Sequence, residues 1–161
     1  MTVPDLDPAV RRMTDLIGGV PDELLGGPTP CVETSLGDLL DHVSGLTLAF
    51  IAAATKATGE TGSQAPSAET WRDPAAWSGM TEAGGRELPG EVAGLVALDE
   101  LVIHGWDLAR ASGQPYDCDQ ETLEAVHGFV VQFSEPRWRR SAKGSSDPWS
   151  RCRRTRRSSI E

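Results

Sequence analysis

The sequence predicts an all-α fold, and three observations support this prediction. Four stretches carry apolar residues at helical spacing, no stretch shows a convincing strand pattern, and no segment is repeated. The 161 residues are 39% hydrophobic and 24% charged, which is typical of a globular chain with one modest core. Four helices joined by one long connection are typical of a four-helix bundle.

The first two predicted helices have recognisable starts. Asp7 followed by Pro8 is typical of a helix N-terminus, and the apolar spacing that follows ends at a Gly-Gly pair. Ser35 and Asp38 then resemble a capping box. His42 lies on the flank of the second helix, which should extend to about residue 57 with an apolar stripe of Leu36, Leu39, Leu40, Val43, Leu46 and Phe50.

The long connection covers residues 58–90 and is rich in Gly, Ser, Thr and Pro. We interpret it as an extended crossover with one short helix near residues 73–79, because such long connections are unusual in a small domain. Trp71 and Trp77 within it are predicted to be packing anchors rather than ligand contacts.

The third predicted helix opens at Pro89-Gly90 and ends near Gly113. Its apolar residues surround it almost completely, which indicates a buried helix. The fourth helix should begin near Asp117 or Asp119, and it carries Leu123, Val126, Val130 and Phe133 at helical spacing.

Three polar residues, Glu100, His104 and Asp107, share one face of the buried third helix. At 100° per residue, Glu100 and His104 lie ~40° apart and Asp107 lies ~20° from Glu100. A charged group on a buried helix is costly unless it is paired or binds a metal. Residues at i and i+4 can reach one ion, and His42 could supply a third ligand from another helix.

The pattern therefore predicts a divalent-metal site formed by His42, Glu100 and His104. Two histidines and one carboxylate are typical of zinc with an open position for water or substrate. Nickel, cobalt or iron(II) would also suit these ligands. The alternative interpretation is a buried hydrogen-bonded pair of Glu100 and His104, with His42 an ordinary surface histidine.

Other candidate residues have two interpretations each. Asp107 either orients a ligand or a bound water, or is a carboxylate on the helix surface. Cys31 could approach a metal, although a buried inert thiol is the commoner role. His127, beside the stripe of the fourth helix, should be structural or solvent-facing.

Several protein classes are disfavoured by the sequence. It contains no G-x-S-x-G motif, P-loop or dinucleotide fingerprint, which argues against serine hydrolases and nucleotide enzymes. No apolar run approaches the ~20 residues of a membrane span, so no membrane association is expected. Without a signal peptide, Cys31, Cys118 and Cys152 are predicted to be reduced thiols of a cytoplasmic protein.

The charge changes sign along the chain. Residues 1–136 hold 6 Lys/Arg and 22 Asp/Glu, whereas residues 137–161 hold 9 Lys/Arg and 2 Asp/Glu. We expect a helical domain over 1–136 and a basic, disordered tail over 137–161. The tail is either a real arm that binds RNA, DNA or membrane, or the product of a reading-frame shift in a GC-rich gene. Nucleic-acid binding rests on this tail alone, because the acidic body repels phosphates.

Two motifs resemble a known family. Pro28-Thr-Pro-Cys31 followed by Leu36-x-Asp38-Leu39-Leu40-x-His42-Val43 is similar to the start of an actinobacterial branch of the DinB-like superfamily. That branch includes the metal-binding domain of mycothiol-dependent maleylpyruvate isomerase. The longer and more specific match is Glu100-x-x-x-His104-Gly-Trp-Asp107-Leu-Ala, continuing to Pro115. Thr34 departs from the family, where Trp is frequent, and the basic tail replaces a final apolar helix.

The resemblance covers residues 5–135 approximately and implies a DinB-like four-helix bundle with a long crossover between the second and third helices. It implies that His42, Glu100 and His104 are the metal ligands. It also implies that the open metal position receives the thiol of mycothiol or bacillithiol, whose pKa a metal would lower.

The resulting expectation is a metal- and thiol-dependent transferase or isomerase that acts on an unknown small substrate. Isomerisation of maleylpyruvate itself is not expected, because the isomerase uses a further C-terminal domain. The alternative is a metal-binding or regulatory module without catalysis. A homodimer is an option, because without the final helix apolar bundle surface would be exposed.

Overall fold

The computed structural model describes residues 3–56 and 67–134, and this part of the chain is mostly helical, as predicted. The predicted basic tail, 137–161, and residues 57–66 of the crossover lie outside the described residues. The described elements are α1 (Asp7–Gly18), η1 (Asp22–Leu24), α2 (Leu36–Thr55), α3 (Ser67–Thr70), η2 (Pro74–Trp77), β1 (Met80–Ala83), β2 (Arg86–Pro89), α4 (Gly90–Ser112) and α5 (Gln120–Ser134).

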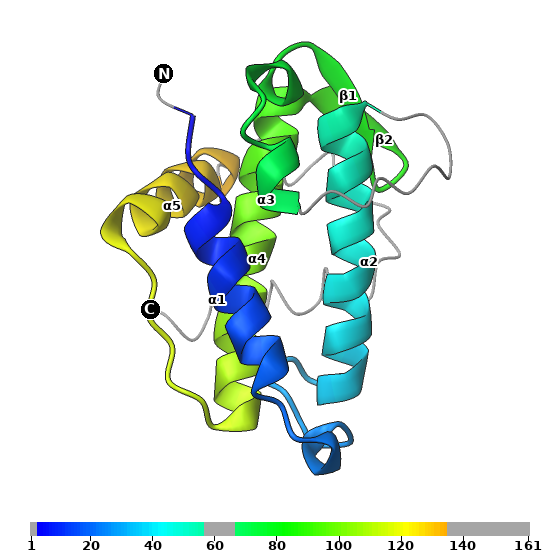
Figure 1. Ribbon diagram of the computed structural model, residues 1–161, viewed down its shortest axis with the longest axis vertical. Coiled ribbons are helices and arrows are strands. Elements are labelled where there is room, and N and C mark those ends of the chain that lie inside the picture. Colours follow the sequence, from blue (N-terminus) through cyan, green and yellow to red (C-terminus); the bar gives the residue numbers. More distant parts are fainter. Residues whose placement is uncertain (1–2, 57–66, 135–161) are drawn as a thin grey trace.

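Helix α4 is the central element of the structure. It packs against α1, α2 and α5, which lie around it in Figure 1. Its residues contribute to two hydrophobic clusters, one around Trp77 and Leu98 and the other around Leu39 and Leu108. The predicted burial of this helix is confirmed, since Leu98 and Leu108 have no exposed surface.

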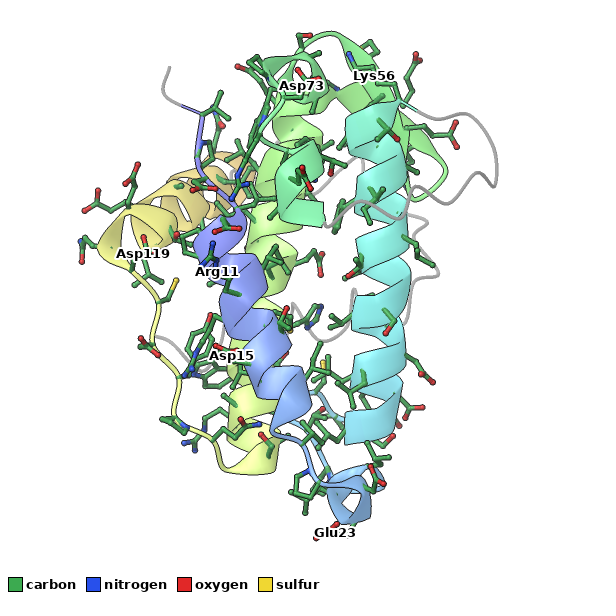
Figure 2. The ribbon with its side chains drawn as sticks, viewed as in Figure 1. Arg11, Asp15, Glu23, Lys56, Asp73 and Asp119 are labelled. Carbon is green, nitrogen blue, oxygen red and sulfur yellow. The ribbon has the colours of Figure 1, made fainter. Side chains whose placement is uncertain are left out.

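Charged side chains cover the outer surface of these helices. Glu23, Lys56 and Asp73 are examples of exposed charged residues that project from the ribbon in Figure 2. This distribution agrees with an acidic, hydrated exterior around an apolar interior.

Most of the predicted helix ends are confirmed. Ser35 accepts a hydrogen bond from the backbone N–H of Asp38, and the Asp38 carboxylate accepts one from the backbone N–H of Ser35. Gly113 ends α4 with φ of 72°, a left-handed conformation that glycine adopts without strain. Asp119 accepts a hydrogen bond from the backbone N–H of Thr122 at the start of α5.

The predicted role of Asp7 as a helix cap is wrong. Leu6 occupies the N-cap position of α1, where no side chain makes a capping hydrogen bond. The Asp7 carboxylate instead forms ion pairs with Arg11 at 2.6 Å and with Arg72 at 3.0 Å. Arg72, from the crossover, thus binds the Asp7 carboxylate that was predicted to cap the helix.

The prediction of a fold without strands is also wrong, because β1 and β2 form an antiparallel hairpin. Gly84 and Gly85 connect the strands with φ of 59° and 72°, which suits a tight hairpin turn. Each strand has only four residues, too few for a convincing alternation. The hairpin is fixed to α2 because the Thr81 hydroxyl donates a 2.6 Å hydrogen bond to the carbonyl of Ala53.

Helix α2 is the one described helix that is long and apolar enough to span a membrane by length and composition. Its best 18-residue window has a mean hydropathy of 1.3. Polar residues interrupt its apolar ones, so the helix contains no continuous apolar run of the length that a membrane span needs. A core helix of a soluble protein passes the same test, and α2 has one face packed against α4.

Candidate metal centre

The candidate site lies between α2 and α4. The capping box at Ser35 and Asp38 sets the start of α2, and His42 follows two turns later on the face toward α4. Glu100 and His104 lie one turn apart in the middle of α4, where their side chains face the same direction. The contacts of α2 with α4 therefore bring together the three residues predicted from the sequence.

Nitrogen and oxygen atoms of these residues converge on one small volume. His104 Nε2 lies 2.8 Å from Glu100 Oε2, and His42 Nε2 lies 4.0 Å from the same oxygen. The two imidazole rings meet edge to face, with centroids 5.0 Å apart and planes at 89°. One ligand atom from each residue lies within 4.8 Å of the other two, so the group could hold a metal ion.

The group is largely shielded from water. Glu100 and His104 are 4% and 3% exposed, and the His42 side chain is 16% exposed. The interpretation of His42 as an ordinary surface histidine is therefore wrong. Such burial strengthens electrostatic interactions, and so favours a cation at the Glu100 carboxylate.

Asp107 completes the arrangement from the next turn of α4. Its Oδ2 lies 3.2 Å from His104 Nδ1, and its side chain is fully buried. The alternative of a helix-surface carboxylate is therefore wrong. A carboxylate that binds one imidazole nitrogen directs the other nitrogen toward a metal and raises its basicity.

The polar surroundings also change the proton affinity of His104. Burial lowers its pKa, but hydrogen bonds with Asp107 and Glu100 outweigh this effect, so that the pKa lies above the usual 6.5. The site therefore favours positive charge at this imidazole. A proton and a divalent cation would compete for the Nε2 lone pair.

The donor set fits a small divalent ion. Zinc bonds to imidazole nitrogen and carboxylate oxygen are ~2.0–2.2 Å long. At a tetrahedral angle, two such bonds place their ligand atoms ~3.3–3.6 Å apart. His42 Nε2 and Glu100 Oε2 are 4.0 Å apart, so a small approach of the two side chains would let one ion bind both. Three protein ligands would leave a further position for water or a small molecule.

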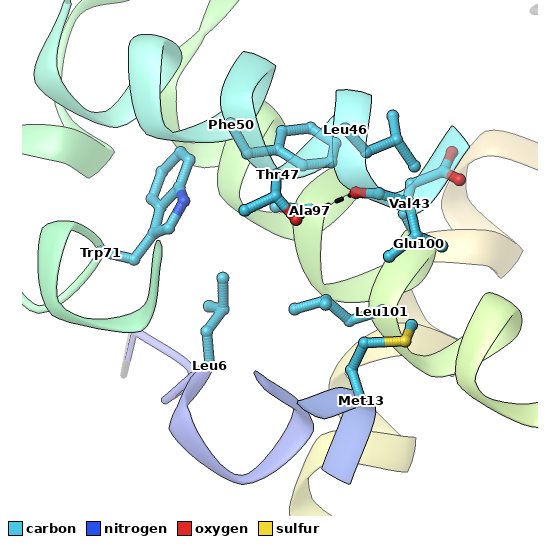
Figure 3. Close-up of a pocket in the computed structure, with 10 residues that line it drawn as sticks. All are labelled: Leu6, Met13, Val43, Leu46, Thr47, Phe50, Trp71, Ala97, Glu100 and Leu101. Carbon is cyan, nitrogen blue, oxygen red and sulfur yellow. Dashed lines mark hydrogen bonds between the residues drawn. The ribbon is translucent and has the colours of Figure 1, made fainter. Parts of the chain in front are cut away.

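An apolar pocket adjoins this group. It is a small hollow that is partly open to solvent, and Glu100 lies at one end of it in Figure 3. The other lining residues are Leu6, Met13, Val43, Leu46, Thr47, Phe50, Trp71, Ala97 and Leu101. The candidate metal ligands are thus beside a mainly apolar hollow that is partly open to solvent.

One of the two predicted packing anchors also lines the pocket. Trp71 and Trp77 are both buried in the core as expected, and Trp71 lies in addition at the end of the pocket opposite Glu100 (Figure 3). No local pattern distinguishes the two tryptophans, because both are aromatic residues in an irregular segment. Only the packing of that segment over α1 and α2 separates their roles.

The remaining candidate residues do not join the site. His127 is exposed on α5, which agrees with the solvent-facing prediction. Cys31 is buried and disulfide-bonded, so the prediction of a reduced thiol is wrong for this residue. Cys118 is a free, half-buried cysteine whose pKa is raised, mainly by burial and by the nearby Asp119 carboxylate.

Fold and site together define a mostly helical protein with a His-Glu-His group that could hold a metal ion. The chain is 31% identical over 147 residues to two Mycobacterium tuberculosis proteins, "Uncharacterized protein MT0763" of strain CDC 1551 and "Uncharacterized protein Rv0738" of strain H37Rv. The match covers 75% of this chain and 75% of each relative, so the chain belongs to the family of these mycobacterial proteins. No protein-family model and no solved structure match it.

Proposed function

We propose that this protein is a metal-dependent enzyme with a DinB-like four-helix-bundle fold and a divalent ion, most simply zinc, at His42, Glu100 and His104. The observation that carries the proposal is the convergence of three ligand atoms within 4.8 Å, from α2 and α4. Nickel, cobalt and iron(II) are the other ions that suit this donor set.

In this proposal the ion would bind the sulfur of mycothiol or a similar small thiol, lowering its pKa so that the thiolate predominates. Residues of the chain itself would orient the metal ligand and hold the second substrate. Asp107 accepts a hydrogen bond from His104 Nδ1 and keeps Nε2 directed toward Glu100. The adjoining pocket would hold the apolar part of the second substrate. The reaction class is thiol transfer or isomerisation.

The pocket narrows the choice of substrate. No Lys or Arg is among the described residues that line it. Away from the proposed ion, the carboxylates of a dicarboxylate such as maleylpyruvate would lose their hydration without gaining a cationic partner. We therefore propose a substrate whose buried part is apolar, which agrees with the expectation that maleylpyruvate is not the substrate.

The second candidate function is a metal-binding or regulatory module without catalysis. The presence of a pocket beside the ligands favours the enzyme, because a structural metal site is usually closed by four protein ligands. A module would bind the ion but show no coupled binding of a thiol and a second ligand.

Elemental analysis of the purified full chain tests the metal site. We expect about one equivalent of a divalent ion, and its loss in His104→Ala, because two remaining ligands hold such ions poorly. The matched control is His127→Ala, which removes an exposed histidine and should leave the metal content unchanged. Wild-type protein without metal, after growth with ample zinc and nickel, would refute the proposal.

Calorimetry with mycothiol tests the thiol. If the thiol binds the ion as thiolate, binding should release a proton, and the observed enthalpy should depend on the ionisation enthalpy of the buffer. His104→Ala should lose this binding together with the metal. Equal thiol affinity in the metal-depleted protein would place the thiol elsewhere and favour the non-catalytic module.

A further inference from the structure

The far end of the pocket carries a buried hydrogen-bond donor that the metal group does not use. Trp71 is 3% exposed and lines the pocket at the end opposite Glu100 (Figure 3). Its Nε1–H has no hydrogen-bond partner among the residues that the structure describes. Buried tryptophan N–H groups normally have a partner, so this donor points to a ligand that supplies an acceptor.

The neighbouring Trp77 differs from Trp71, because its indole N–H has a hydrogen-bond acceptor. Trp77 Nε1 donates a 2.7 Å hydrogen bond to the backbone carbonyl of Trp71. The two rings meet at 69° with centroids 5.2 Å apart, which fixes the orientation of the Trp71 ring. In Figure 3 the nitrogen of Trp71 lies on the ring edge that faces the pocket.

The other lining residues limit the chemistry of the ligand. Thr47 donates its hydroxyl hydrogen to the Val43 carbonyl at 2.9 Å, as the dashed line in Figure 3 shows. Trp71 is therefore the side-chain donor that this part of the pocket can offer to a ligand. A carboxylate would meet only apolar groups and one N–H, and would lose more hydration than it regains. A neutral oxygen acceptor avoids that cost.

The pocket extends along α2 and is partly open to solvent. Lining residues Val43 and Phe50 are seven positions apart, which corresponds to ~10 Å along the helix. A molecule placed there would contact Phe50 and Leu101 and extend toward Glu100. Its acceptor would lie at the Trp71 end, away from the candidate ion.

We propose that this pocket binds a neutral, mostly apolar carbonyl compound whose oxygen accepts a hydrogen bond from Trp71 Nε1. This inference rests on the proposed function, because it names the substrate class of the same site. Only the reaction of the bound compound depends on the metal and the thiol. Binding of the carbonyl compound itself requires the pocket and not the ion.

The experiment compares two probes that differ only at the acceptor. Cyclohexanone carries a carbonyl oxygen, whereas methylenecyclohexane has the same ring with a carbon in that place. Each probe is titrated into the full chain and followed by the indole N–H resonances in a nitrogen–proton NMR spectrum. Trp71→Phe identifies the Trp71 resonance by its loss and keeps an aromatic ring in the pocket.

We expect cyclohexanone to shift the Trp71 indole N–H resonance, and methylenecyclohexane to leave it nearly unchanged. Trp71→Phe should weaken cyclohexanone binding about fivefold more than methylenecyclohexane binding, the typical effect of one hydrogen bond. The matched control is Trp106→Phe, because Trp106 is 41% exposed on α4 and does not line the pocket. It should leave both affinities unchanged.

An unshifted Trp71 resonance, or equal weakening of both probes by Trp71→Phe, would overturn the inference. The wild-type shift decides the question by itself if Trp71→Phe fails to fold. A parallel titration of His104→Ala separates the two proposals. Retained cyclohexanone binding without metal supports the pocket inference, whereas metal binding without any cyclohexanone binding refutes it and leaves the metal proposal intact.

Discussion

Both halves of α4 are largely buried, but for different physical reasons. The first half, residues 90–99, meets its neighbours through small residues, and a Cβ on Gly94 would lie 2.5 Å from the Trp77 ring. The second half, residues 100–112, buries Glu100, His104 and Asp107, which pair with one another. The first half therefore depends on the close approach of the helix to the Trp77 ring, and the second half on pairing of polar side chains. Substitutions in the first half should change stability, and substitutions in the second half should change metal affinity.

The largest effect is expected from Asp107→Asn in the polar half. The substitution keeps the size of the side chain but removes the charge next to His104 Nδ1. We expect the affinity for the divalent ion to fall ~10–100-fold, as is usual when the partner of a metal-binding histidine is changed. A competition titration with a chelator measures this affinity, and an unchanged value would show that Asp107 has only a packing role.

Gly94→Ala tests the close-packed half. Trp77 is 6% exposed and its Nε1 is hydrogen-bonded, so the ring cannot move freely away from a new methyl group. We expect the free energy of unfolding to fall by ~1–3 kcal/mol, with no change in metal content. Chemical denaturation and elemental analysis on the same samples measure the two quantities.

Gly128→Ala is the matched control for that substitution. Gly128 lies on α5, and no atom would lie within 4 Å of a Cβ added there. The same methyl group should then raise the free energy of unfolding by up to ~1 kcal/mol through helix propensity. Destabilisation of similar size at both glycines would mean that the contact with Trp77 is not the cause.

Ser35→Ala examines a polar pair at the surface, for comparison with the buried pairs of α4. It removes the acceptor for the Asp38 backbone N–H at the start of α2, and should lower the free energy of unfolding by about 1 kcal/mol. Ser44→Ala, an exposed site in the middle of the same helix, should have little effect. Thermal melts of both variants compare these effects, and the metal content should remain unchanged in each.

The smallest effect concerns the pH dependence of that capping box. Hydrogen bonds from the side chain and backbone of Ser35 hold the pKa of Asp38 below its usual 3.8. A lowered pKa in the folded state means stabilisation that is present above the unfolded-state pKa and is lost as the pH falls through the folded-state pKa. The stability difference between wild type and Asp38→Asn should therefore shrink below about pH 4. A difference that is constant from pH 7 to pH 2.5 would contradict this.

Two errors in the sequence prediction, at Asp7 and at the hairpin, involve contacts between distant segments. Asp7 was assigned to the helix end but pairs with Arg72, which is 65 positions away. The hairpin of β1 and β2 is too short to show a pattern, and Thr81 fixes it to the carbonyl of Ala53. In both cases a contact between distant segments overrides the local signal.

The features that depend on local geometry could be predicted from the sequence. The capping box at Ser35 and Asp38, the left-handed Gly113 and the common face of Glu100, His104 and Asp107 follow from backbone preferences and the helical period. Tertiary structure decided the rest. The approach of His42 to Glu100 and the place of Trp71 in the pocket depend on which helix faces pack together, and no spacing along one helix contains that information.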